Sequence, residues 1–418
     1  MRLQSFKVIA SLLVAAAITV GCGGGSPAPA PTGLKAVATE STVTVTWDAT
    51  PGVEYWLFYA PTVYAPKDNS NMSRWFNLLG GAVLLNVGQP YAVTGLVNAN
   101  NYSFTVNGRT GGGPGGAAAT TVTATPRLAG STWTAATAAT TQDLRGLAYS
   151  GTYVAVGSGG VILTSPNATA WTSATSPTTN ALNGTAFYAT SVVSSTVVTT
   201  PNYLAVGDAG TLLYSNDLVT WTAKSSGTSK NLYAAANNGA ISVVVGAGGT
   251  ILTSTDGTTW TPATASATTN DLYTVSYAAS VWYAAGANGT LVRSTDGLTW
   301  TTVTTGSTVD FHGFSYGAST STTSSVAFVL VGNGGTVLTS ADATTWTAQV
   351  LPGSTRLNAV VYGGQFVTVG NSGQIFTSTD AITWTAATSG TTTNLLTLAR
   401  GTYMYATTGV SGTNLISK

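Results

Sequence analysis

The chain has 418 residues, of which only 6% are charged, with 14 lysines and arginines against 13 aspartates and glutamates. The net charge of +1 gives no field that would hold a nucleic acid, and the 44% of hydrophobic residues indicates a large core rather than disorder. One cysteine excludes an internal disulfide, and two glutamates and one histidine exclude sites that need clustered Glu or His. We therefore expect no metal, no cofactor and no nucleic-acid partner.

The N-terminus has the pattern of an export signal. Two basic residues precede an apolar run from Val8 to Val20, too short to span a bilayer as a helix but suited to a signal-peptide core. The Gly21-Cys22 pair that follows resembles the end of the bacterial lipobox, in which the cysteine becomes the acylated first residue of the mature protein. The resemblance implies a signal peptide over 1–21 and membrane attachment through lipid on Cys22.

Residues 22–31 are expected to form a tether. After Cys22 the sequence reads Gly-Gly-Gly-Ser-Pro-Ala-Pro-Ala-Pro, which is flexible first and stiffer later. In lipoprotein sorting, an Asp after the cysteine retains the protein at the inner membrane. Here Gly23 occupies that position. The resemblance therefore implies a location in the cell envelope, at the outer membrane or the cell surface.

Residues 32–127 are expected to form a small β-sandwich. Alternating hydrophobicity predicts strands at 43–47, 55–59, 102–106 and 121–125, separated by Gly, Pro and Asn. Trp47 ends the first of these segments, and Leu96 precedes Tyr102 by six residues, as in a tyrosine corner. These details resemble the fibronectin type III family. The resemblance implies a spacer or binding role without catalysis, and we favour a spacer.

Residues 128–418 contain a sevenfold repeat. Tryptophans recur at Trp133, Trp171, Trp221, Trp260, Trp300, Trp346 and Trp384. Gly-x-x-Gly pairs begin at Gly157, Gly207, Gly246, Gly286, Gly332, Gly370 and Gly409. An apolar residue, which we call the anchor, recurs at Leu144, Leu182, Leu232, Leu272, Phe311, Leu357 and Leu395.

Each repeat predicts four short strands, the unit of a β-propeller blade. The region begins with only the outer end of a blade, Ser131-Thr-Trp133, and finishes with a blade over 394–418 that lacks this end. The two pieces complement each other. The sequence thus predicts an all-β fold: a fibronectin type III-like sandwich followed by a seven-bladed β-propeller with a composite closing blade, and almost no helix.

A second motif precedes six of the tryptophans, for example Ser254-Thr-Asp-Gly-Thr-Thr-Trp260. It resembles the Asp-box, or BNR repeat, of bacterial sialidases and of photosystem II assembly-factor propellers. We expect the Asp and Ser side chains to accept hydrogen bonds from the N–H groups of their own turn. One motif per blade also disperses the aspartates around the ring, so we assign them to stability rather than to a site.

A candidate site follows from the residues beside the anchors, because inner strands of propellers begin at the mouth of the central channel. These positions differ from blade to blade and are mostly polar or aromatic, which suits ligand binding. The ligand-binding candidates are Arg145, Asn231, Tyr233, Asp271, Tyr273, Asp310, His312, Arg356 and Asn358. An equally plain interpretation is that these residues hydrate the channel and cap strand ends.

Two functions are compatible with this sequence. The first is a monomeric, surface-anchored propeller that binds a glycan or a protein over blades three to five. The second is a glycoside hydrolase or lyase with Asp271 and Asp310 as a carboxylate pair and His312 as a base. A sialidase is disfavoured because the repeats contain no glutamate. The scarcity of Glu and His favours binding without catalysis.

Overall fold

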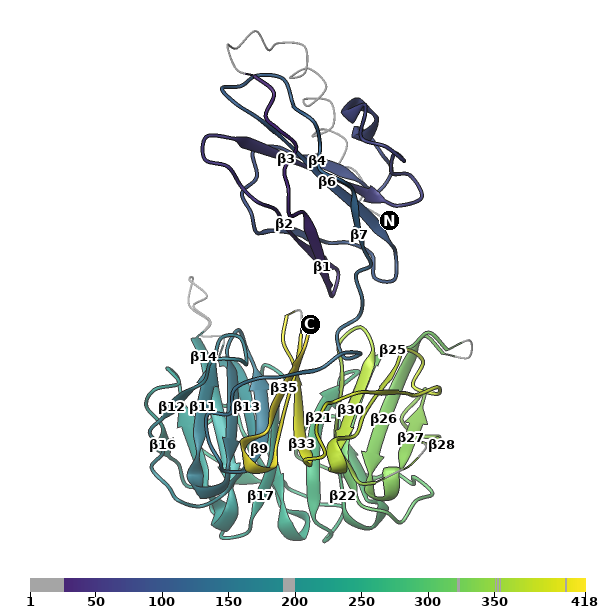
Figure 1. Cartoon of the computed structure of the whole chain (residues 1–418). Coiled ribbons are helices and arrows are strands. Elements are labelled where there is room, and N and C mark those ends of the chain that lie inside the picture. Colours follow the sequence, from purple (N-terminus) through teal and green to yellow (C-terminus); the bar gives the residue numbers. More distant parts are fainter. Residues whose placement is uncertain are drawn as a thin grey trace. The chain divides into compact units, whose positions relative to one another are not determined.

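The computed structural model describes residues 26–190, 200–321, 324–349, 351, 353, 355–402 and 404–418. The expected signal peptide and Cys22 lie outside these residues. Within the described chain, no helix is both long enough and apolar enough to cross a membrane. The chain divides into two compact units, Met1–Leu128 and Ala129–Lys418, and each is described by itself (Figure 1).

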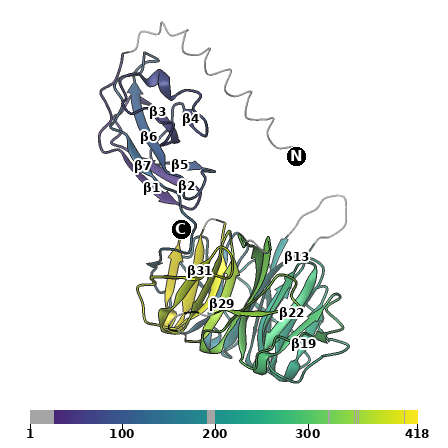
Figure 2. The same cartoon turned by 90° about the vertical axis from the view of Figure 1, so that its right-hand side faces the viewer.

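Ala129–Lys418 consists of seven four-stranded antiparallel sheets, the blades, arranged around a ring (Figures 1 and 2). Blade 1 contains β9 (Leu144–Tyr149), β10 (Tyr153–Gly157), β11 (Ile162–Ser165) and β12 (Thr172–Ala174). Blade 2 contains β13 (Leu182–Thr190), β14 (Thr200–Gly207), β15 (Leu212–Ser215) and β16 (Thr222–Ala223). Blade 3 contains β17 (Leu232–Asn237), β18 (Ser242–Gly246), β19 (Ile251–Ser254) and β20 (Thr261–Pro262).

The next three blades repeat this order. Blade 4 contains β21 (Leu272–Ala278), β22 (Val281–Gly286), β23 (Leu291–Ser294) and β24 (Thr301–Thr302). Blade 5 contains β25 (Phe311–Ala318), β26 (Val326–Gly332), β27 (Val337–Ser340) and β28 (Thr347–Gln349). Blade 6 contains β29 (Leu357–Tyr362), β30 (Phe366–Gly370), β31 (Ile375–Ser378) and β32 (Thr385–Ala387).

Blade 7 is composite, as predicted. It combines β33 (Leu395–Arg400), β34 (Tyr405–Gly409) and β35 (Asn414–Ser417) with β8 (Thr134–Ala135) from the beginning of the unit. Strand β35 pairs with β8 in antiparallel register. The N–H of Gly130 also donates to the hydroxyl of Ser417 at 2.7 Å. The two ends of the repeat region therefore close the ring together.

The hydrophobic core lies between neighbouring blades. The described residues form seven buried clusters in this unit, one at each blade junction. At the junction of blades 2 and 3, for instance, Leu204 packs in one cluster with Leu232 and Trp260. The seven anchors are at most 2% exposed. The anchors recur in the sequence because each one is buried at a junction between blades. Burial of apolar surface is the main stabilising contribution at these junctions.

Each Gly-x-x-Gly pair forms a short 3₁₀ turn after the second strand of its blade. The turns are η2 (Ser158–Gly160), η3 (Asp208–Gly210), η4 (Ala247–Gly249), η5 (Ala287–Gly289), η6 (Asn333–Gly335), η7 (Asn371–Gly373) and η8 (Val410–Gly412). The middle residue of each turn has φ between 53° and 66°, the left-handed region. Four of these middle residues are not glycine: Ala209, Asn288, Ser372 and Ser411. Such positions need support from elsewhere in the structure.

The first unit contains two antiparallel sheets. One has the order β1-β2-β5 and the other β4-β3-β6-β7. Their strands are β1 (Lys35–Thr39), β2 (Thr42–Thr46), β3 (Glu54–Pro61), β4 (Ala82–Leu84), β5 (Tyr91–Thr94), β6 (Tyr102–Arg109) and β7 (Val122–Ala124). The sequence pattern indicated β2, β3, β6 and β7 but not β1, β4 and β5. Trp47 is buried in the core, and the N–H of Val97 donates to the Tyr102 hydroxyl at 3.2 Å.

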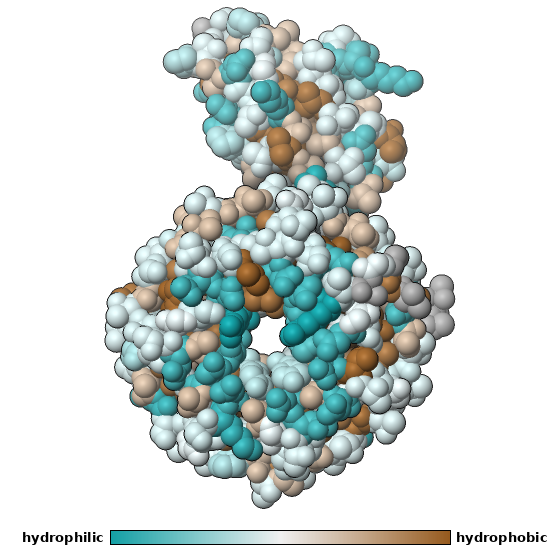
Figure 3. Space-filling model, turned by 60° about the horizontal axis from the view of Figure 1, so that its bottom comes forward, coloured by the Kyte–Doolittle hydropathy of each residue, from teal (hydrophilic) through white to brown (hydrophobic). Residues whose placement is uncertain are grey.

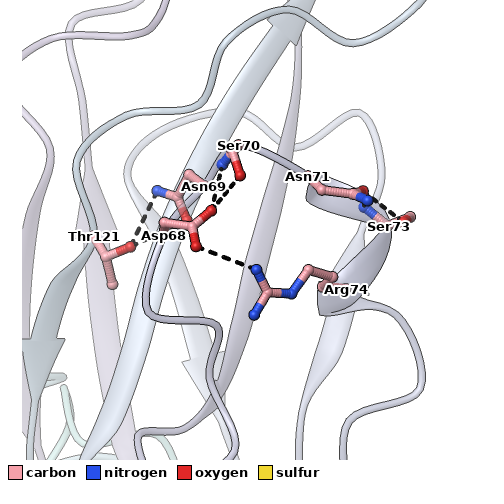
Figure 4. A network of polar contacts seen from close by, with 7 residues as sticks. All are labelled: Asp68, Asn69, Ser70, Asn71, Ser73, Arg74 and Thr121. Atoms are coloured by element: carbon pink, nitrogen blue, oxygen red, sulfur yellow. Dashed lines mark hydrogen bonds and ion pairs between the residues drawn. The ribbon is translucent and has the colours of Figure 1, made fainter.

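The segment between β3 and β4 covers one sheet with its own small cluster. It contains η1 (Met72–Trp75), and the buried Trp75 packs on Phe58 of β3. A polar network ties this segment down (Figure 4). Asp68 pairs with Arg74 at 3.2 Å, and Asn69 donates to Thr121 at 3.1 Å. These contacts connect the segment to the rest of the unit through Thr121.

The expected tether joins the fold earlier than its composition indicated. Pro27 forms a β-bridge with Arg109 at the end of β6, and the N–H of Ala28 donates to the carbonyl of Gly108. Ala28 is only 5% exposed. Residues 26–31 are consequently part of the first unit. A Gly/Pro composition does not reveal this, because the partner strand lies about 80 residues away in sequence.

Candidate functional site

The residue after each anchor occupies a β-bulge. In all seven inner strands the register against the second strand shifts here, so one residue has no pairing partner. A bulge redirects a side chain away from the regular alternation. The seven bulge residues all line one cavity of about 610 Å³: Arg145, Asn183, Tyr233, Tyr273, His312, Asn358 and Leu396. Figure 3 shows hydrophilic residues gathered around the opening at the centre of the ring.

The residue before each anchor has a different role. In five blades its side chain accepts the N–H of the left-handed residue in the preceding blade's 3₁₀ turn, at 2.8–3.0 Å. The acceptors are Asp143, Asn231, Asp271, Asp310 and Asn394. We call these side chains the interblade caps. Asn231, Asp271 and Asp310 are not among the residues that line the cavity, so the candidate set divides in two.

Two blade junctions have no such cap among the described residues. There the position before the anchor holds Ala181 or Arg356, and the left-handed residue of the preceding turn is Gly159 or Gly334. Each of the four non-glycine residues in this position has a cap. Gly248 is capped as well, so the two uncapped turns share one feature, a glycine in the left-handed position, which adopts this conformation without support.

This geometry does not provide the carboxylate pair that the hydrolase hypothesis requires. The Asp271 carboxylate accepts the N–H of Gly248, and Asp310 accepts the N–H of Asn288 and the side-chain amide of Asn333. Both carboxylates are thus engaged in turns rather than directed at the cavity.

Three rings form a row along adjacent blades at the cavity. The centroids of Tyr233 and Tyr273 are 5.4 Å apart, and those of Tyr273 and His312 are 5.1 Å apart in a stacked arrangement. Burial raises the pKa of both tyrosines, and the Asp271 carboxylate raises it further. We call these three rings the ring row. All three side chains are uncharged at neutral pH.

A chain of hydrogen bonds fixes the tautomer of His312. Because the amide nitrogen of Asn333 donates to Asp310, its Oδ1 must accept from His312 Nε2–H, at 2.9 Å. Nδ1 of His312 then accepts from Arg356 Nη2 at 3.3 Å. Burial, together with the Arg356 charge, lowers the pKa of His312 to about 4. His312 is accordingly a neutral imidazole that holds Arg356 in place.

The two arginines at the cavity differ in their partners. Arg145 donates to Asn183 Oδ1 at 3.2 Å and lies 4.0 Å from the Asp143 carboxylate. Arg356 has no ion pair with any described carboxylate, and burial lowers its pKa. Its guanidinium group is therefore a cation at this cavity whose charge is not paired with a carboxylate.

Asn358 has one satisfied and one unsatisfied end. Its amide nitrogen donates to Asn371 Oδ1 at 2.9 Å and to the Leu395 carbonyl at 2.7 Å. Its Oδ1 is buried without a partner among the described residues. Asn183 makes the equivalent donations to Asp208 and Leu232, but its Oδ1 accepts from Arg145.

Sequence reasoning missed the first residue of the 3₁₀ turn. Asp208, Asn333 and Asn371 occupy this position, and each one bonds the bulge residue of its own blade. The other four turns have Ser, Ala or Val there. The sequence contained one sign of this pairing. Where the first residue of the turn is Asp or Asn, the residue after the anchor of the same blade is Asn or His.

The turns of the Asp-box-like motif, which we call Asp-boxes after that resemblance, lie at the opposite ends of the blades, since each follows the third strand, which runs parallel to the first. Asp256 accepts the N–H groups of Thr258 and Thr259, both at 2.7 Å, and Ser254 accepts that of Gly257 at 2.8 Å. The indole of Trp260 donates to the Gly257 carbonyl. The side chains thus bond their own turn, as the sequence indicated. Within the described residues, no three His, Cys, Asp or Glu side chains cluster as metal ligands.

Comparison with known proteins identifies the architecture of the second unit. The sequence matches no protein-family model and no curated protein. Among solved structures, YCF48 from Cyanidioschyzon merolae is 14% identical with a TM-score of 0.53, over 68% of this chain and 98% of that one.

Two further structures show the same likeness. YCF48 bound to D1 peptide is 14% identical with a TM-score of 0.54, over 68% of this chain and 96% of that one. The WD40 β-propeller domain of Doa1 is 11% identical with a TM-score of 0.51, over 68% and 95%. At these identities the likeness concerns the fold alone, and Ala129–Lys418 is a seven-bladed β-propeller.

Proposed function

We propose that this chain is a protein-binding propeller, held at the cell envelope by lipid on Cys22, that takes a peptide segment of its partner at the channel mouth. One observation carries the proposal. The ring row of Tyr233, Tyr273 and His312 adjoins the unpaired Arg356 on four consecutive blades, at a cavity of about 610 Å³. Aromatic and Arg side chains in a concave site are typical of protein recognition.

A structural neighbour supports a protein ligand over a glycan. One YCF48 structure of the same fold contains a D1 peptide. The described carboxylates nearest the ring row, Asp271 and Asp310, accept backbone N–H groups of turns and do not line the cavity. Sugar hydroxyls need acceptors of this kind, so their engagement makes a glycan the weaker choice.

The first unit suits a spacer of the fibronectin type III type. The chain joins this unit beside Arg109 and leaves it where Tyr102 pairs with Ala124, at the two ends of β6. A strand of this length spans roughly 25 Å. The chain would therefore enter and leave this unit about this far apart, as a spacer requires. Gly23 after Cys22 favours the outer membrane or the cell surface, on the resemblance to lipoproteins.

Two experiments test the proposal. Panning a random peptide library on the full chain should yield binders that a Tyr233→Ala, Tyr273→Ala and Arg356→Gln variant no longer retains. The matched control is Tyr149→Ala with Tyr277→Ala, which removes two tyrosines at the other ends of inner strands. Peptides that bind the triple variant as well as they bind the wild type, or a library that yields no binders, would refute the peptide site.

The anchor is tested separately. Cys22→Ser should move the protein from the membrane fraction to the soluble fraction of the cell envelope, because no lipid can be attached. A variant that sediments with the membranes as the wild type does would show that Cys22 is not the anchor.

A further inference from the structure

The cavity has an excess of hydrogen-bond donors over acceptors on its charged side chains. Its charged lining residues are Arg145, Arg356 and Asp143. Asp143 already accepts the N–H of Ser411 and lies beside Arg145. Arg356 keeps donors available, and the hydroxyls of Tyr233 and Tyr273, which can each donate one hydrogen bond, also line the cavity. A ligand that fits this lining offers acceptors and needs few of its own donors satisfied.

The ring row restricts the shape of such a ligand. Its rings follow one another at 5.4 and 5.1 Å on blades 3, 4 and 5. The first and last rings are therefore no farther apart than these two distances together, a span that can face one polyproline II turn, which advances ~9 Å. Aromatic-lined grooves with this character bind proline-rich segments, whose polyproline II conformation is already formed before binding.

Proline also matches the donor excess. A proline residue has a backbone carbonyl but no N–H, so a run of prolines brings acceptors and leaves no donor without a partner. In a polyproline II helix the carbonyls make no internal hydrogen bonds. They are free to accept from tyrosine hydroxyls and from a guanidinium group.

We propose that the ring row and Arg356 bind a proline-rich segment of the partner in the polyproline II conformation. The pyrrolidine rings pack on Tyr233, Tyr273 and His312, while Arg356 and the tyrosine hydroxyls donate to backbone carbonyls. This assignment rests on the proposed peptide-binding function and names the class of peptide. His312 contributes a fixed, uncharged face, because both of its ring nitrogens are already bonded within the protein.

The test uses the full chain and a capped polyproline peptide about three polyproline II turns long. We expect binding that weakens at least about tenfold when alternate prolines are replaced by alanine, since each alanine restores an N–H and loosens the chain. Tyr273→Ala should weaken binding about tenfold or more, as for an aromatic contact at an interface. Tyr277→Ala, on the same strand and 37% exposed, should leave the affinity within about twofold.

Each other outcome has a defined meaning. If a capped acidic peptide without proline binds and the polyproline peptide does not, the proline assignment fails while the peptide-binding function stands. If a soluble oligosaccharide binds and no peptide does, both fail. Equal losses for Tyr273→Ala and Tyr277→Ala, with both variants folded by thermal melting, would place the site elsewhere. An affinity indifferent to the proline-to-alanine exchange would also overturn the inference.

Discussion

The two kinds of turn in each blade solve the same problem with different partners. Both contain a left-handed residue, for example Gly257 in an Asp-box and Ala209 in a 3₁₀ turn. In the Asp-box the stabilising acceptors come from the same turn, two or three residues away, as Asp256 and Ser254 show. In the 3₁₀ turn the acceptor comes from the next blade, as Asn231 does for Ala209. Asp-boxes thus hold a blade together internally, and interblade caps hold blades to each other.

The largest effect on this comparison is expected from an Asp-box tryptophan. Trp260 is buried at the junction of blades 2 and 3, so it couples a local turn to the interblade core. Trp260→Ala should lower the free energy of unfolding by about 3–5 kcal/mol, measured by chemical denaturation. Trp260→Phe should cost clearly less, because it keeps most of the packing. A smaller loss for alanine than for phenylalanine would contradict the packing role.

Removing an Asp-box carboxylate should cost less. Asp256→Ala leaves the N–H groups of Thr258 and Thr259 without their acceptor. We expect a loss of about 1–2 kcal/mol and faster hydrogen exchange confined to these two amides. Accelerated exchange in the neighbouring blade would show that the Asp-box is not a local device.

Removing an interblade cap should cost less again. Asp271→Ala takes a single acceptor from Gly248, so we expect a loss of about 0.5–1.5 kcal/mol. Hydrogen exchange should accelerate at Gly248, more than 20 residues away in sequence and in the preceding blade. Unchanged exchange at Gly248 would contradict the interblade role.

An uncapped junction offers the reverse experiment. Ala181→Asn places an acceptor before the anchor Leu182, where the preceding turn has Gly159 in the left-handed region. By analogy with Asn231 we expect a gain of about 0.5–1 kcal/mol, measured by thermal melting. Ala181→Leu is the control for size alone, and an equal gain from it would refute a cap.

His312 of the ring row and the Asp-box carboxylates should affect stability in different ranges of pH. His312 has a pKa of about 4 in the folded chain and about 6.5 when unfolded, so the unfolded state binds an extra proton between these values. Stability should thus decline as the pH falls from 6.5 to 4, and His312→Gln should remove this decline.

The Asp-box carboxylates should respond only at lower pH. Each accepts hydrogen bonds from the backbone N–H groups three and two residues further along the chain, and these bonds lower the pKa of the carboxyl group. The stability that these carboxylates contribute should therefore persist until the pH falls below about 3.8; they are Asp217, Asp256, Asp296 and Asp342. A melting temperature that is constant from pH 7 to 4 would contradict the expected effect of His312.

The sequence by itself determined whatever depends on near neighbours or on repetition. Trp, Gly-x-x-Gly and the anchors recur because every blade needs the same junction and the same turns, so the seven blades and the composite closure were predictable. The Asp-box geometry was predictable as well, since Asp256 reaches only residues two and three positions away.

Only the tertiary structure decided the roles of the residues on either side of each anchor. Asp271 and Tyr273 both have polar groups and are only two positions apart, yet one caps the preceding blade and the other lines the cavity. Tyr273 occupies a bulge and Asp271 does not, and a bulge is defined by pairing with another strand. The partners of Asp271, His312 and Asn358 all come from 13 or more residues away. Local pattern cannot specify such contacts, because they exist only once the strands and blades have come together.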